Sequence, residues 1–251
     1  MLKKLLLTFV LIFGAYNANA QYYNTYTEVG IMAGPVFFKS DFGEAANVEN
    51  FVKNNGFSIG GFFYISQVED LESFRENFKL RAELSYLKAD LEHYGQYVDP
   101  SKKSLFANQL RAMSGSTQVT SAGFQVEFYP FKIDDYVRGM TFSPYVGFGP
   151  QVNYFSSKVT SSLGELNFPY TTPVKYMNAL RTNDDYAFSL TGTLGIRYKL
   201  SEYHSLIAEA RGQHYFSDWV DGMNPDKNIY TENKSNDWNI GINFGYIYYF
   251  Y

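Results

Sequence analysis

Residues 78–87 read FKLRAELSYL, and they decide the fold. Apolar side chains stand at every second position, and the positions between them carry Lys79, Arg81, Glu83 and Ser85. A period of two predicts a β-strand whose side chains alternate between two faces. Because the charged residues share one face, the strand separates an apolar environment from a polar one.

Seven other segments repeat this alternation. Together with the first they cover residues 28–37, 57–66, 78–87, 120–130, 142–154, 187–200, 206–216 and 238–251. Each has about the 9–11 residues that a tilted strand needs to cross a bilayer. Long polar stretches follow the odd-numbered segments, and the shorter stretches 67–77, 131–141 and 201–205 lie between the others. This predicts an all-β fold: an eight-stranded antiparallel up-and-down transmembrane β-barrel with long extracellular loops.

A secreted β-sandwich or a lipocalin-like barrel would show the same period, with its apolar face turned inward. Two features of the segments favour the membrane barrel, and a third lies at the C-terminus. The polar faces are rich in Gly, Ser, Thr and opposite charges, unlike the Lys/Glu surface of a soluble strand. Aromatic residues gather at segment ends, as in interfacial girdles: Phe57, Tyr86, Phe128, Tyr154, Tyr198, Phe216, Trp238, Tyr248 and Phe250.

The first twenty residues are expected to be a signal peptide. Lys3 and Lys4 precede an apolar stretch at 5–15, and the segment closes on the small-x-small pattern of residues 18–20. The stretch is shorter than the ~20 residues of a membrane-spanning helix, which disfavours the alternative of a membrane anchor. We therefore expect a signal peptide at 1–20, a mature barrel at 21–251, and integral insertion in the outer membrane of a Gram-negative cell, in contact with its lipid.

The composition excludes several function classes. The chain of 251 residues has no cysteine, so disulfides, thiolate metal sites and cysteine nucleophiles are impossible. Lys and Arg number 21 against 25 Asp and Glu, a net charge of −4. A nucleic-acid partner is not expected, because such proteins carry a basic footprint. Aromatic residues reach 19%, which suits a membrane barrel better than a soluble enzyme.

The C-terminal segment carries an insertion signal. Residues 243–250 read NFGYIYYF and resemble the terminal β-signal that the barrel-assembly machinery recognises, with Asn243, Gly245, Tyr248 and Phe250 at the pattern positions. An exposed edge strand would pair with that machinery while alternate side chains give specificity. The chain departs from the pattern in one respect, since Tyr251 follows Phe250.

The polar faces are expected to fill the barrel with charge. An eight-stranded barrel is just wide enough for side chains to fill it, and buried charges must be paired. We favour a salt-bridged core over a lumen for ions or protons. The predicted network consists of Lys79, Arg81, Glu83, Glu127, Arg197, Lys199, Glu209 and Arg211, with Glu28 on the same side of the wall.

Signals for catalysis or for metal are weak, and no catalytic residue, cofactor or resident metal is expected. His93 lies in the second outer loop beside Asp90 and Glu92, where we expect an ordinary solvated histidine. The fourth loop carries an oxygen-rich patch, for which turn chemistry is the simpler explanation and calcium an open alternative. That patch consists of Asp218, Asp221, Asn224 and Asp226.

Four blocks carry a resemblance to known proteins. They read EVGIMAGP at 28–35, LRAMSGST at 110–117, YFSDWVDGMNP at 215–225 and ENKSNDW at 232–238. The chain resembles a family of small outer-membrane barrels from Bacteroidota, mainly flavobacteria, and its architecture is more distantly similar to OmpX-type and PorT-like barrels. The resemblance implies a fold and a compartment and no particular reaction.

Function is expected to reside in the outer loops, because binding residues usually sit on loops held by a rigid scaffold. The leading hypothesis is a non-enzymatic barrel whose loops bind a partner, which could be a subunit of an outer-membrane secretion, assembly or gliding complex or a surface ligand. A small channel or transporter and an enzyme with loop-borne residues are the alternatives. The candidate binding residues, which could instead pack together as a cap, are Leu105, Phe106, Leu110, Met113, Trp219 and Met223.

Overall fold

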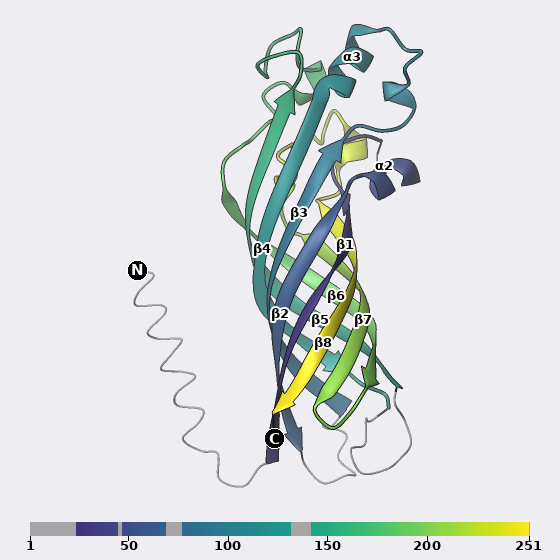
Figure 1. The fold of residues 1–251 in the computed structure, drawn as a ribbon. Helices are drawn as coiled ribbons and strands as arrows, with labels where there is room; N and C mark the ends of the chain where they lie inside the picture. Colours follow the sequence, from purple (N-terminus) through teal and green to yellow (C-terminus); the bar gives the residue numbers. More distant parts are fainter. Residues whose placement is uncertain (1–23, 45–46, 69–76, 132–141, 251) are drawn as a thin grey trace, which may run out of the picture.

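The computed structural model describes residues 24–44, 47–68, 77–131 and 142–250 (Figure 1). Eight long strands dominate it. They are β1 (Asn24–Lys39), β2 (Asn55–Val68), β3 (Phe78–Glu92), β4 (Met113–Phe128), β5 (Phe142–Ser161), β6 (Asp185–Lys199), β7 (His204–Tyr215) and β8 (Trp238–Phe250). Short helices lie between strands: α2 (Val48–Lys53), α3 (Leu105–Ala112), and the 3₁₀ turns η3 (Gln96–Val98), η4 (Val174–Tyr176) and η5 (Thr231–Asn233).

The strands form one closed antiparallel barrel in chain order. Closure comes from β1 pairing with β8, in a register that runs from Thr27 opposite Phe250 to Lys39 opposite Trp238. Each strand therefore has two hydrogen-bonded neighbours, and the sheet has no free edge. The predicted fold class, an eight-stranded up-and-down barrel, is confirmed.

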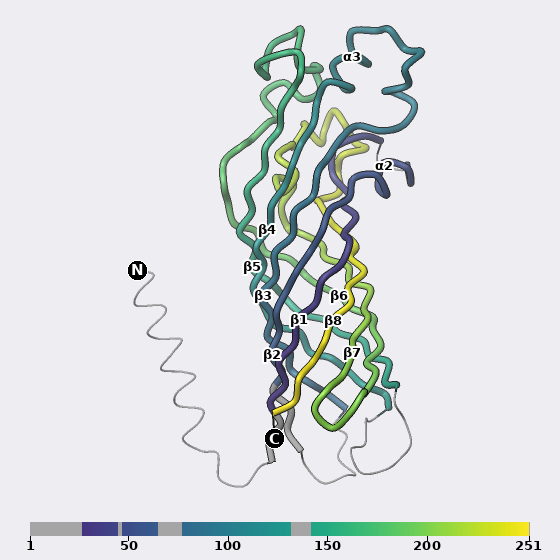
Figure 2. The backbone as a smooth tube through the Cα atoms, viewed as in Figure 1, coloured from purple at the N-terminus to yellow at the C-terminus, as the bar shows by residue number. Residues whose placement is uncertain are grey.

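The two ends of the barrel differ. Four long connections lie at one end, which we call the cap end, and the strand ends joined by shorter connections lie at the other, the turn end (Figure 2). The long connections are residues 40–54, 93–112, 162–184 and 216–237, here numbered first to fourth. β1 begins and β8 ends at the turn end (Figure 1). None of the helices in the described ranges is long and apolar enough to span a membrane.

Near the turn end, the barrel wall is apolar outside and polar inside. In β3, Leu80 and Leu84 are exposed on the outer face, whereas Arg81 and Glu83 are buried on the inner face. The other strands share this arrangement, with Phe124, Phe148 and Phe244 among the exposed outer residues. Such a wall suits a barrel that meets lipid outside and fills its interior with polar side chains.

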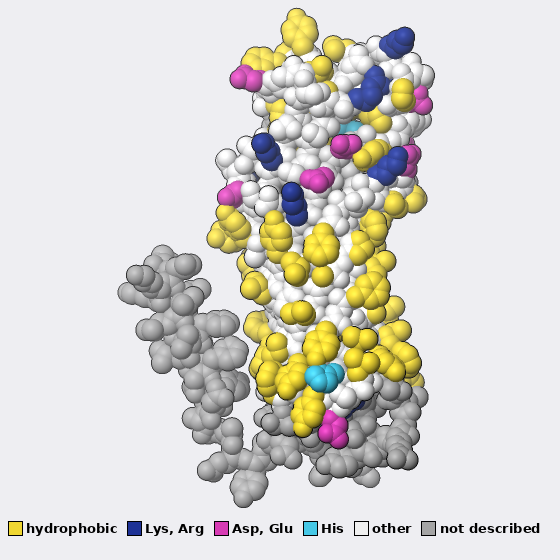
Figure 3. Space-filling model, in the orientation of Figure 1, with side chains coloured by type: hydrophobic (Ala, Val, Ile, Leu, Met, Phe, Trp, Pro, Cys, Tyr) yellow, Lys and Arg dark blue, Asp and Glu magenta, His cyan; other side chains and the backbone are white. Residues whose placement is uncertain are grey.

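The polarity reverses on the same strands near the cap end. In β3, Leu87 and Leu91 are buried inside, while Lys88 and Asp90 point outward and are exposed. β4 and β5 change in the same way, because Val119 and Val159 are buried inside. Figure 3 shows the change from outside, with yellow apolar side chains on the lower wall and charged ones gathered above. The upper barrel is thus built like a soluble protein, around an apolar core.

This reversal explains why the predicted strand bounds were too short. β4 starts at Met113 rather than at 120, β5 continues to Ser161 rather than ending at 154, and β3 reaches Glu92 rather than 87. Beyond the reversal the outward residues are polar and the inward ones are apolar. The predicted segments ended where the apolar outer face ended, although the strands continue. The outer loops are correspondingly shorter than predicted. The expected signal peptide at 1–20 lies outside the described residues.

Candidate functional site

The cap is a packed structure with its own apolar core. Buried side chains from all four long connections join those of the upper strands, including Phe42, Leu110, Tyr176 and Val220. Of the six candidate loop residues, Leu110, Met113 and Met223 are buried in this core, and Trp219 packs against it half-buried. Leu105 and Phe106 remain exposed. The six residues therefore divide between cap packing and a surface.

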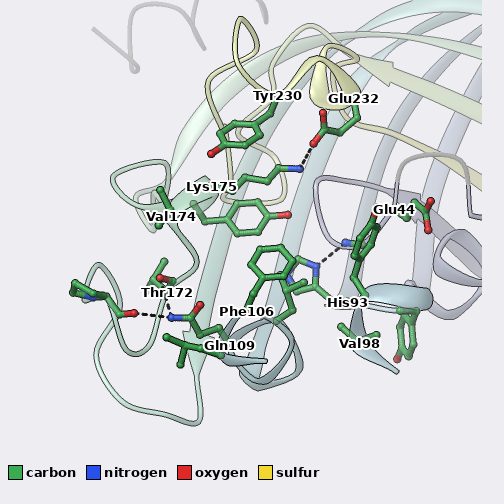
Figure 4. Close-up of a pocket in the computed structure, with 17 residues that line it drawn as sticks. Glu44, His93, Val98, Phe106, Gln109, Thr172, Val174, Lys175, Tyr230 and Glu232 are labelled. Atoms are coloured by element: carbon green, nitrogen blue, oxygen red, sulfur yellow. Dashed lines mark hydrogen bonds and ion pairs between the residues drawn. The ribbon is translucent and has the colours of Figure 1, made fainter. Parts of the chain in front are cut away.

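A cavity of about 910 Å³ opens in the cap, and all four long connections line it (Figure 4). Its walls are mostly aromatic and aliphatic, with a few polar groups. The lining residues are Gly43, Glu44, His93, Tyr94, Tyr97, Val98, Leu105, Phe106, Gln109, Leu110, Pro169, Thr172, Val174, Lys175, Tyr176, Tyr230 and Glu232. Only Leu105, Phe106 and Leu110 among these were singled out as binding candidates from the sequence.

Helix α3 forms one wall. The Ser104 hydroxyl accepts the N–H of Ala107 (3.2 Å), an N-cap that begins the helix, and β4 follows its last residue directly. The Gln109 side-chain amide donates to the carbonyl oxygens of Pro169 (2.8 Å) and Thr172 (3.3 Å). These bonds hold the third connection against the helix, so helix α3 and the third connection together form this wall of the cavity.

His93 lies deep in the cavity wall. Its Nδ1 accepts the backbone N–H of Gly43 (2.7 Å), and its ring lies near those of Phe42 (4.9 Å between centroids) and Tyr176 (5.6 Å). Only 6% of the residue is exposed, so the expectation of a solvated loop histidine was wrong. Burial, with a smaller effect of the Lys175 charge, lowers the pKa of His93 to about 3, which keeps the ring neutral. Its Nε2 has no hydrogen-bond partner among the described residues.

Lys175 and Glu232 supply the charge on the opposite wall. Their side chains form an ion pair (2.8 Å) between the third and fourth connections. The Lys175 ammonium also lies 5.5 Å from the centroid of the Tyr176 ring and 5.3 Å from that of Tyr230. In the view of Figure 4, this pair lies on one side of His93 and Gln109 on the other.

In the cap, three buried carboxyl groups connect the first and fourth connections. The N–H of Asp41 donates to Asp221 (2.7 Å), and the N–H of Asp221 donates to Asp237 (3.1 Å). Burial raises the pKa of Asp41 to about 7 and holds those of Asp221 and Asp237 well above their ordinary values, and repulsion from nearby carboxylates, Asp218 among them, adds to the effect.

Each acidic side chain of the oxygen-rich patch has its own partner within the fourth connection. Asp221 accepts the N–H of Met223 (2.7 Å), Asp226 accepts that of Asn228 (2.9 Å), and Asp218 pairs with Lys227 (3.1 Å). These are turn contacts and a partly exposed ion pair. Within the described ranges, no group of three or more His, Cys, Asp or Glu side chains is placed to hold a metal ion.

Inside the lower barrel, charged side chains form two groups. In the first, fully buried Arg81 contacts Glu83 (2.8 Å), Glu127 (3.1 Å) and Glu209 (2.8 Å), and Arg211 also pairs with Glu83. The hydroxyls of Tyr145 and Tyr64 donate to Glu209 (2.7 Å) and Glu127 (3.0 Å).

The second group centres on Glu28, which pairs with both Arg197 and Lys79. Of the eight residues of the predicted network, the structure thus places seven in these two groups. The eighth, Lys199, lies 5.2 Å from the centroid of the Tyr249 ring near the turn end. The guanidinium groups of Arg81 and Arg197 are buried, so side chains fill the barrel interior at the level of these two residues.

The residues of the terminal signal divide between the two faces of β8. Asn243 is buried inside and accepts the Ser58 hydroxyl proton (2.9 Å). Gly245 permits close approach of the neighbouring strand, because a Cβ there would lie 2.4 Å from the carbonyl oxygen of Ile31. Tyr248 and Phe250 face outward, with their ring centroids 4.8 Å apart in an edge-on arrangement.

These features define a class: an eight-stranded β-barrel of the outer-membrane type, with a filled interior, an apolar outer wall and a packed cap that holds a cavity. The chain belongs to the family described as a domain of unknown function, DUF6089, whose profile matches residues 3–251. No curated protein compared with the sequence matches it.

Solved structures with the same general architecture are distant. A major outer membrane protein from Thermus thermophilus is 16% identical over 90% of this chain and 100% of its own, with a TM-score of 0.49. Neisserial surface protein A is 12% identical over 91% and 99%, with a TM-score of 0.48. The attachment invasion locus protein Ail of Yersinia pestis is 12% identical over 90% and 99%, with a TM-score of 0.44. Similarity at this level is too low to carry a function from one chain to another.

Proposed function

We propose that this protein is a non-enzymatic binding protein of the outer membrane of a Gram-negative bacterium, of Bacteroidota as the four sequence blocks suggest. The leader at 1–20 would export it, the apolar outer wall would meet lipid, and the cap would project from the cell surface. The cavity in the cap is the observation that carries the proposal. It would take a small organic molecule.

The size and the chemistry of the cavity support a binding role. Its volume of about 910 Å³ lies within the ~300–1,000 Å³ of small-molecule sites, which are mainly apolar with a few placed polar groups. Its walls are held together by interactions between connections, such as the Gln109 contacts and the Lys175–Glu232 pair. A ligand would therefore enter a site that is already formed.

The two alternative functions have less support. A catalytic histidine needs a ring nitrogen that accepts a proton, and the Nδ1 of His93 is already occupied by the Gly43 N–H. A channel needs a continuous polar path, whereas Arg81 and its three glutamates occupy the interior of the lower barrel.

A protein partner is the second candidate, because two apolar residues remain exposed beside the cavity. Leu105 and Phe106 are 55% and 42% exposed although both line it. A subunit of a secretion, assembly or gliding complex could place an apolar side chain there. In that case the cavity would receive part of a protein rather than a free molecule.

A fluorinated-fragment screen by 19F NMR tests the proposal, with the purified protein in lipid nanodiscs and empty nanodiscs as the blank. Leu105→Trp places a larger ring in the cavity. Leu163→Trp changes an exposed leucine of the third connection that does not line the cavity, and serves as the matched control. We expect some fragments to broaden with the wild type and with Leu163→Trp but not with Leu105→Trp. A screen in which no fragment separates the wild type from Leu105→Trp would refute the proposal.

A further inference from the structure

We infer that the cavity takes an uncharged, mainly apolar molecule that presents a carbonyl oxygen to the Nε2–H of His93. This inference rests on the proposed function and adds to it the chemistry of the ligand. Four properties of the cavity carry it: the tautomer of His93, the unused donor on its ring, the charges on the walls, and the aromatic surroundings.

The tautomer of His93 follows from one hydrogen bond. A backbone N–H can only donate, and that of Gly43 points at Nδ1 from 2.7 Å. Nδ1 must therefore hold a lone pair. A neutral imidazole carries one proton, so that proton is on Nε2. The ring is neutral because burial lowers its pKa to about 3.

The Nε2–H is a donor without an acceptor. His93 is buried, its Nε2 has almost no accessible surface, and it meets no hydrogen-bond partner among the residues that the structure describes, so a ligand oxygen reaches it by displacing a neighbouring side chain of the cavity wall. The flanking groups do not serve it, since Phe42 has only a ring and the Tyr176 hydroxyl donates to the carbonyl oxygen of Asp41 (3.1 Å). An unpaired buried donor costs free energy, which a ligand oxygen would recover. A ligand that carries an acceptor would therefore complete the wall of the cavity.

The charges on the cavity wall disfavour an anionic acceptor. Lys175 contributes one positive charge, and Glu44 and Glu232 contribute two negative ones, so the lining carries 1 − 2 = −1 with His93 neutral. Lys175 is also already paired with Glu232. A carboxylate or phosphate would enter a site without a free cation among these lining residues. A neutral carbonyl oxygen can accept the Nε2–H of His93 without bringing an unpaired negative charge into the cavity.

The other walls of the cavity favour a ligand whose main part is apolar. Phe106, Tyr97 and Tyr230 offer ring surfaces, and Leu105 and Val98 offer aliphatic ones. A polyhydroxylated sugar would need many polar partners in this space, because each hydroxyl removed from water requires a hydrogen bond. Among the lining side chains, the Nε2–H of His93 is the buried neutral donor without a partner, and it matches a ligand with one dominant acceptor and a ring or chain around it.

The test compares two probes of nearly equal shape, 4-fluoroacetophenone and 4-fluoro-α-methylstyrene, which differ by replacement of the C=O with C=CH₂. Binding is measured by 19F NMR on the full protein in nanodiscs and corrected for partition into empty nanodiscs. One neutral hydrogen bond predicts about tenfold tighter binding of the ketone. In His93→Asn the side-chain oxygen can still accept the Gly43 N–H while the Nε2 donor is lost, so the preference should disappear.

A second measurement reads His93 directly. The chain has three histidines, so the His93 signals in a 15N-labelled sample can be assigned by their loss in His93→Asn. We expect Nε2 protonated and Nδ1 not, with the Nε2–H signal shifted by the ketone and unmoved by the styrene. This measurement needs no binding by the variant, and its assignment requires only that His93→Asn keep the heat-dependent gel shift of a folded barrel.

The outcomes separate this inference from the proposed function. Equal binding of the two probes to the wild-type cavity, or a proton on Nδ1, overturns the carbonyl inference and leaves a binding cavity. Failure of both probes to bind above the nanodisc blank overturns this inference together with the proposed small-molecule site. Ketone-selective binding that persists in His93→Asn also overturns the role of the ring, provided that the variant keeps the heat-dependent gel shift of a folded barrel.

Discussion

The backbone N–H of Asp41 donates to the side chain of Asp221 at 2.7 Å, across 180 positions in the sequence. The contact joins the connection after β1 to the connection after β7. Asp221 in turn donates its N–H to Asp237, which also accepts the N–H of Val220 (3.0 Å). Three carboxyl groups are thereby buried together at the base of the cap, and this arrangement has consequences for pH dependence.

We predict that the cap loses stability as pH rises from about 4 to about 7. The pKa of Asp41 is raised from its ordinary value of 3.8 to about 7, so the folded cap binds protons that the unfolded chain releases. Unfolding then becomes easier with rising pH until Asp41 is ionised in both states. Asp41→Asn should make this profile less steep, with Asp221 and Asp237 left to contribute, and should raise the melting temperature of the cap at neutral pH. Fluorescence of Trp219 in a Trp238→Phe background reports the transition.

Asp226→Asn is the control for this experiment. Asp226 lies in the fourth connection as well, but it is exposed and takes no part in the three-carboxyl arrangement. Its profile should follow that of the wild type. If Asp41→Asn and Asp226→Asn gave the same pH profile, ionisation of Asp41 would not contribute to the pH dependence.

Breaking the buried pair in the second interior group should cost more than removing it. Glu28→Gln leaves the guanidinium of Arg197 buried without its carboxylate, which we expect to destabilise the barrel by about 3–5 kcal/mol. The double variant Glu28→Gln/Arg197→Met should be less destabilised than Glu28→Gln alone. Urea unfolding in lipid vesicles measures both. A double variant whose loss equals the sum of the two single losses would argue against a coupled pair.

A charge placed on the outer wall tests contact with lipid. Leu84 is 61% exposed on β3, between Gly61 and Ala122 of the neighbouring strands. If lipid covers this face, Leu84→Arg should cost about 2–4 kcal/mol. Leu163→Arg, at a leucine of the cap that is 49% exposed, should be nearly neutral. If water rather than lipid covered Leu84, Leu84→Arg and Leu163→Arg would lose equally little unfolding free energy in lipid vesicles.

Phe250→Ala should reduce insertion more than folded stability. Phe250 faces outward at the end of β8, where Tyr248 is its edge-on neighbour, and it occupies the last position of the terminal signal. Phe244→Ala removes an exposed ring from the same face nearer the middle of the strand, and should show the opposite balance. The amount recovered in the outer membrane measures insertion, and heat resistance on gels measures stability. Equal membrane yields for Phe250→Ala and the wild type would contradict a role for Phe250 in the terminal insertion signal.

The lower barrel could be predicted from the sequence because one physical rule applies along it. An apolar outer face and a filled polar interior impose strict alternation, so the positions of Leu84 and Arg81 alone predict which face each side chain occupies. The same parity placed Arg197 and Glu209 on the inner face. What alternation could not predict is which charges meet, since Arg81 and Glu209 lie on strands far apart in the chain.

The cap could not be predicted in the same way, for two physical reasons. Past Tyr86 in β3 the outward side chains change from apolar to polar, so an apolar residue there faces the inside of the barrel rather than the outside. The role of His93 depends on Gly43 and Tyr176, which reach it through two other connections. Contacts of this kind produce no periodic pattern in the sequence, so the sequence did not distinguish a buried histidine from an exposed one.

The direct continuation of α3 into β4 has a kinetic consequence. The helix that lines the cavity is anchored in a hydrogen-bonded ladder of sixteen residues, so its backbone is already ordered in the empty protein. Ordering a free loop costs about 1–2 kcal/mol for each residue, and a ligand meeting this wall would not bear that cost. Association should therefore be limited by diffusion to the mouth of the cavity rather than by a slow rearrangement, and residence time should depend on the contacts made inside.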